Sequence, residues 1–148
     1  MFFYQKIDWT DFSLWGAGIL LILLLVAAIS DFKTQKISNI ISYTGIIFFI
    51  ILCFLNIESF WQNLTVFIIV FLFFGTLFAL KWMGGGDVKM FLLLSVAIPV
   101  QFLLSCFLWV FVFGGVFGLF CLFKKKKSIP YAVPIFCGTL FYFLMSAL

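Results

Sequence analysis

The chain has 148 residues, of which 66% are hydrophobic and only 9% are charged, and its formal net charge is +4. Soluble domains carry about 25% charged residues, so this composition excludes a soluble globular protein and predicts an integral membrane protein. The chain contains no histidine, which removes the commonest metal ligand and the usual proton shuttle near neutral pH.

Hydropathy divides the chain into six apolar stretches. The N-terminal segment MFFYQKIDWTDFSLW lacks the basic-then-apolar order of a cleavable signal, so we expect the first stretch to be retained. The stretches cover residues 14–29, 40–57, 64–80, 88–98, 102–123 and 133–148, with polar loops at 30–39 and 58–63.

The fourth and fifth stretches come from dividing a longer apolar run at Pro99 and Gln101. Residues 88–123 exceed the roughly 20 residues that one membrane helix needs, so a short fourth helix and a full fifth helix are expected there. The predicted fold class is all-α, a polytopic membrane protein of six transmembrane helices forming one domain over residues 1–148.

The lysines predict the topology. Lys33 and Lys36 follow the first stretch, Lys81 and Lys89 lie around the third and fourth, and the run 124–127 precedes the sixth. These are alternate loops, so the positive-inside rule places them in the cytoplasm and both termini outside. The run at 124–127 is read as a topology anchor that attracts anionic lipid, with a docking site for a protein partner as the alternative.

The four cysteines, Cys53, Cys106, Cys121 and Cys137, all fall in apolar stretches and form no CxxC pair. They are interpreted as small buried apolar side chains, not as a disulfide framework or a metal site. We therefore expect neither a bound metal nor a zinc motif.

Two of the five acidic residues differ from the rest. Asp31 ends the first apolar stretch and Asp87 begins the fourth, so the predicted topology puts both at the cytoplasmic ends of their helices. An ionisable group inside a membrane costs roughly 2.5–3.5 kcal/mol at the centre and marks a functional site by default. The alternative is that they are interfacial aspartates paired with Lys33 and Lys89. Asp8, Asp11 and Glu58 lie in polar flanks and need no further explanation.

Three consecutive glycines, Gly84, Gly85 and Gly86, precede Asp87. Each costs about 1 kcal/mol relative to alanine in a helix, but glycine permits positive φ and close approach of another chain. Irregular backbone at membrane depth survives only where protein or a wet cavity covers it. The stretch GGGD therefore predicts a cavity beside Asp87. The backbone N–H groups of this stretch could also contact the backbone of an extended peptide.

Two carboxylates held close together cannot both ionise easily, so the pair shares a proton near neutral or mildly acidic pH. One then takes a proton from water while the other protonates a peptide carbonyl oxygen, which is aspartic-protease chemistry without metal or histidine. Lys89 could adjust the ionisation of the aspartate pair or bind a substrate carboxylate. Alternatively, it is a lysine that only anchors the cytoplasmic side of the chain.

GGGDVKM resembles the Gly-x-Gly-Asp motif of the type IV prepilin peptidases. SDFKTQKISN resembles the first aspartate motif of that family, with Asp31 ahead of Ile-Ser-Asn, and SIPYAVPI is similar to its Ile-Pro-Tyr segment. The resemblance, from residue 14 to the C-terminus, implies proteases of the cytoplasmic (inner) membrane that cut the basic leader from pilin-like precursors. It implies Asp31 and Asp87 as catalytic residues. The residues expected to contact substrate are Gly84, Gly85, Gly86, Lys89, Asn39 and Pro130.

The absence of CxxC motifs makes the chain similar to the short, peptidase-only forms of tight-adherence pilus systems or to the preflagellin peptidases. We therefore expect no cofactor and no S-adenosylmethionine site. The expected partners are pilin-like precursors and the lipid bilayer, without nucleic acid. Adhesive pilus, DNA-uptake pilus, secretion pseudopilus and archaeal filament all stay open as the system served.

A different class of function also accommodates intramembrane carboxylates and a broken helix: a small proton- or ion-coupled transporter, or a non-catalytic membrane assembly subunit. A transporter usually places such groups near the midplane, whereas both aspartates are predicted at one interface. Cysteine accessibility at positions 31 and 87 distinguishes the two.

Overall fold

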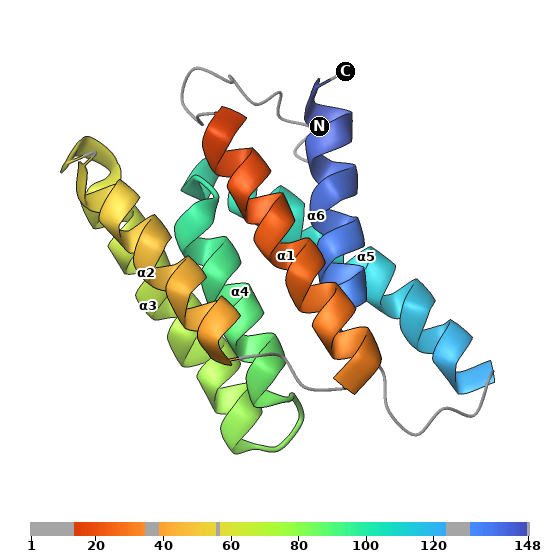
Figure 1. The fold of residues 1–148 in the computed structure, drawn as a ribbon. Helices are drawn as coiled ribbons and strands as arrows, with labels where there is room; N and C mark the ends of the chain where they lie inside the picture. The colour runs from red at the N-terminus through yellow and green to blue at the C-terminus, as the bar shows by residue number, and fades with distance from the viewer. Residues whose placement is uncertain (1–13, 35–38, 56, 124–130, 148) are drawn as a thin grey trace.

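The computed structural model describes residues 14–34, 39–55, 57–123 and 131–147, and these form an all-helical bundle (Figure 1). In chain order the helices are α1 (Leu14–Thr34), α2 (Asn39–Leu55), α3 (Ile57–Ala79), α4 (Gly85–Ala97), α5 (Val100–Phe123) and α6 (Ala132–Ala147). The predicted all-α fold is confirmed.

Three helices are long and apolar enough to cross a membrane, over Trp15–Lys33, Trp61–Ala79 and Val100–Cys121. The helices α2 and α6 are shorter but also apolar, and α4 has 13 residues. These lengths fit an all-α membrane protein, while six complete spans stay a prediction.

The predicted break at Pro99 is confirmed. Ile98 leaves the helical region, with φ −107° and ψ 130°, as expected of a residue before proline. The backbone N–H groups of Phe102 and Leu103 then donate to the carbonyl oxygen of Pro99 and start α5. One long apolar run thereby becomes two helices.

Two loops were predicted too long. Residues 58–63 belong to α3, and α1 continues to Thr34. Neither segment contains glycine or proline, so nothing in the backbone stops the helix, although hydropathy falls there. The consequence for function is that Asp31 lies within a regular helix.

The short helix α4 forms the centre of the bundle. It contacts all five other helices. Every residue from 88 to 98 is buried except Lys89, which is half-buried. A helix that is apolar all round is one that neighbours cover on every side.

Phenylalanines join α4 to its neighbours α3 and α5. The ring of Phe91 stacks on Phe74, with centroids 4.3 Å apart, and on Phe111 at 5.6 Å. Phe107 meets Phe91 edge-on at 5.4 Å. Such pairs add about 0.5–1.5 kcal/mol each beyond their buried area, so this cluster fixes α4 in the bundle.

The helices α5 and α6 approach each other closely at Gly138 of α6. A Cβ atom there would lie 2.5 Å from the Cα of Val110 in α5 and 3.0 Å from the carbonyl carbon of Trp109. The backbones of α5 and α6 therefore touch, which only glycine permits.

The cysteines agree with their interpretation in part. Cys106 and Cys121 are buried free thiols, and Cys137 is a half-buried one. The side chain of Cys53 lies outside the described part of the chain.

Candidate active site

Asp31 lies near the C-terminal end of α1, and its side chain is 6% exposed. Its Oδ2 accepts a hydrogen bond of 3.0 Å from the backbone N–H of Ala132, the first residue of α6. The first N–H groups of a helix have no partner within the helix and carry partial positive charge. The start of α6 thus orients the Asp31 carboxylate and stabilises a negative charge on it.

Asp87 lies in the first turn of α4, ahead of the apolar stretch 88–98. Its N–H donates to the carbonyl oxygen of Gly84 at 3.1 Å. Its carboxylate folds back over the same glycine, because a Cβ at position 84 would lie 3.0 Å from Oδ2 of Asp87. Any larger residue at position 84 would displace this carboxylate.

Burial, and next the negative charge of Asp31, raise the pKa of Asp87 to about 6, while a hydrogen bond with the backbone of Gly84 acts in the opposite direction. Two carboxylates that are far apart in the sequence are thus within electrostatic range of each other. In Figure 1 the end of α1 and the start of α4 lie at the same end of the bundle.

Of the two properties that glycine permits, positive φ and close approach, the structure uses close approach. No described glycine has positive φ, and Gly85 and Gly86 form the first turn of α4. Close approach is the reason for two of the three glycines: Gly84 faces Asp87, and a Cβ on Gly85 would lie 3.2 Å from Cε2 of Phe78 in α3.

Positive φ occurs instead at Lys81, with φ 60°. The N–H of Lys81 donates to Phe78 and that of Trp82 to Leu77, at 2.9 and 3.0 Å. This pair of bonds closes α3 as a Schellman motif, in which the residue after the helix takes the left-handed conformation. The sharp turn before Asp87 is therefore made by the end of α3.

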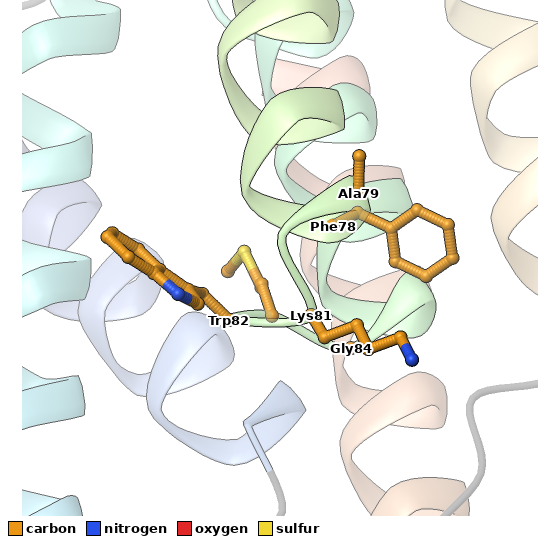
Figure 2. Close-up of a pocket in the computed structure, with 6 residues that line it drawn as sticks. Phe78, Ala79, Lys81, Trp82 and Gly84 are labelled. Carbon is orange, nitrogen blue, oxygen red and sulfur yellow. The ribbon is translucent and has the colours of Figure 1, made fainter.

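An open hollow of about 570 Å³ lies over this turn (Figure 2). Its lining residues are Phe78, Ala79, Lys81, Trp82, Met83 and Gly84. The predicted cavity was expected beside Asp87, but Asp87 does not line this hollow. Gly84 both lines the hollow and lies against the Asp87 carboxylate.

The structure brings Lys89 and Asn39 together. The Nζ of Lys89 donates a 2.6 Å hydrogen bond to Oδ1 of Asn39 and lies 4.8 Å from the centre of the Tyr43 ring. Within the described ranges no ion pair joins Lys89 to Asp87, because residues two apart on a helix face different directions. Pro130 lies outside the described residues.

Sequence reasoning missed Ala132 and Tyr43. Ala132 acts through its backbone N–H, for which no motif codes, although the Pro-Tyr pair ahead of an apolar run marks a helix start. Tyr43 follows Asn39 by four residues, the spacing that puts two side chains on one helix face.

Comparison with known proteins identifies a family for this chain. The model of the type IV leader peptidase family matches residues 18–119, a range that holds both aspartates and the three glycines. No curated protein and no solved structure gives a significant match. The family match covers more than two thirds of the chain. The chain therefore belongs to the type IV leader peptidase family.

Proposed function

We propose that this peptidase is an aspartic endopeptidase that removes the basic leader from type IV prepilin-like precursors at the cytoplasmic face of the inner membrane. The observation that carries the proposal is that the end of α1, which holds Asp31, and the start of α4, which holds Asp87, lie at the same end of the bundle in a chain of the leader peptidase family. The positive-inside rule assigns that end to the cytoplasm, with both termini outside.

The surroundings of the two carboxylates differ, and this assigns their roles. The amide of Ala132 donates a hydrogen bond to the Asp31 carboxylate and holds it in place, and we assign to Asp31 the role of the base that takes a proton from water. Asp87, with its raised pKa, is the acid. The resulting hydroxide adds to the peptide carbonyl carbon while Asp87 gives its proton to the carbonyl oxygen. Collapse of this intermediate returns a proton to Asp87, and Asp31 protonates the leaving amine.

This assignment predicts how the rate depends on pH. Asp87 must be protonated to act as the acid, and its pKa is about 6. The protonated fraction falls as pH rises through that value, so kcat should fall on the alkaline side with an apparent pKa near 6. A rate that stays constant from pH 5 to 9, the range around the ionisation to be tested, would contradict the role of Asp87 as acid.

The variant Ala132→Pro tests the role of Asp31. Proline removes the N–H that donates to Asp31, and it is well tolerated as the first residue of a helix. We expect kcat to fall about tenfold or more, since hydrogen bonds to charged groups contribute roughly 1.5–3 kcal/mol. Ala132→Gly keeps the N–H and serves as the control. Equal activity of the two variants would show that the bond is unimportant for the reaction.

The function itself is tested with purified protein in liposomes and a synthetic precursor consisting of a basic leader followed by an apolar helix. Mass spectrometry of the products should show one cut at the leader junction, with no cut in liposomes that lack the protein. EDTA should leave the rate unchanged, whereas strong inhibition would indicate metal chemistry. Absence of cleavage by well-folded protein would count against the proposed activity.

A further inference from the structure

Lys89 is the one half-buried residue in the otherwise buried stretch 88–98 of α4. Its two contacts, with Asn39 and Tyr43, both lead to α2. The ammonium group is thus engaged by α2, a neighbouring helix, although Lys89 follows Asp87 by only two residues.

The contacts suit a fixed cation. The 2.6 Å bond to Asn39 has the short length of a charge-assisted hydrogen bond. The Tyr43 ring, 4.8 Å away, lies within the range of a cation–π interaction. Asn39 and Tyr43 share one face of α2 because they are four residues apart. We name Lys89, Asn39 and Tyr43 together the α2–α4 tie.

The position of the tie in the chain gives it a consequence for the site. Asn39 is the first residue of α2, and α2 packs against α1, the helix that holds Asp31. Lys89 lies in the same helix as Asp87. The bond between Asn39 and Lys89 therefore joins the helix that holds Asp87 to a helix that packs against the one that holds Asp31.

We propose that the α2–α4 tie is a positioning unit that sets the separation of Asp31 and Asp87. The inference rests on the proposed function. Lys89 is on this view no ligand of the substrate and no direct partner of Asp87, and Asn39 acts through Lys89. Misplacing a catalytic group by about 1 Å can cost on the order of a hundredfold in rate, so a modest shift between α2 and α4 matters.

The test is a cycle of Lys89→Met, Asn39→Leu and the double variant, each assayed for precursor cleavage. We expect each single variant to lower kcat about tenfold to a hundredfold with KM within roughly twofold of wild type. The kcat of the double variant should be no lower than that of the less active single variant, since both changes break the same interaction. Asn39→Asp keeps the acceptor and should retain most activity.

Lys33→Met is the matched control. Lys33 is exposed and follows Asp31 by two residues, as Lys89 follows Asp87. The variant Lys33→Met therefore removes the same charge at the same distance in sequence from an aspartate. It should leave kcat unchanged. If Lys89→Met does not insert into the membrane, Asn39→Leu and Asn39→Asp carry the test alone.

Three results would overturn the inference: independent, multiplying losses in the double variant, a raised KM with unchanged kcat, or wild-type kcat in both single variants. A shift of the alkaline limb of the pH profile in Lys89→Met but not in Asn39→Leu would also overturn it, because Lys89 would then act on Asp87 by its charge. Asp87→Asn in the same assay separates this from failure of the proposed function: an active Asp87→Asn variant would remove the aspartic mechanism itself.

Discussion

Asp31→Asn and Asp87→Asn should each reduce leader cleavage by about a thousandfold or more. Asparagine has nearly the shape of aspartate but neither accepts a proton from water nor donates one to a carbonyl oxygen. General acid–base catalysis by one group contributes roughly 10²–10⁴-fold, and in the proposed mechanism each step needs both groups. The measurement is single-turnover cleavage of a precursor by purified variants in liposomes.

The double variant should be no slower than either single one, because groups that act as a unit lose their effect together. Glu58→Gln removes a carboxylate from the beginning of α3 and should cleave at the wild-type rate. Comparable thermal unfolding midpoints for all variants would show that the losses are not due to misfolding. Wild-type cleavage by either aspartate variant would contradict the dyad.

The sequence predicted the helices well where a strong local signal exists. Pro99 lacks an N–H and restricts the backbone conformation of Ile98, so the end of α4 could be placed from the sequence alone. Where the signal was only a fall in hydropathy, as at residues 58–63, the prediction was wrong, because this segment contains no glycine or proline to end a helix.

The candidate site shows the same division. Carboxylates are rare in this chain, so Asp31 and Asp87 could be selected by their cost in an apolar environment. The partners that distinguish them are a backbone amide at Ala132 and the bare Cα of Gly84, and neither belongs to a side chain. Such contacts depend on how helices meet, which one sequence does not encode as a motif.

The glycines illustrate why residue type alone misleads. A run of three permits positive φ, yet Gly84 has φ −73° and the left-handed residue is Lys81. Glycine serves this turn by leaving room for Asp87 and Phe78. A conformational and a steric reason give the same residue, and only coordinates separate them.

Gly138→Leu should produce the largest loss of stability in the described part of the chain. The atoms that a new side chain would meet are backbone atoms, the Cα and N of Val110 at 2.5 and 2.8 Å, which cannot move by changing rotamer. The helices α5 and α6 must separate instead. Overpacking costs typically 1–3 kcal/mol, occasionally more, and leucine should exceed what Gly138→Ala costs.

The matched control is Gly75→Ala in α3, where nothing lies within 4 Å of the added Cβ. Alanine should be neutral or stabilising there, by up to about 1 kcal/mol, because it favours a helix more than glycine does. Thermal unfolding in detergent measures both variants, and equal midpoints for Gly138→Ala and Gly75→Ala would contradict the close contact. Because α6 also supplies the amide of Ala132 that holds Asp31, partial separation of α5 and α6 should lower cleavage before the protein unfolds. Gly138→Ala is therefore expected to lose activity at temperatures where its helices remain intact by circular dichroism.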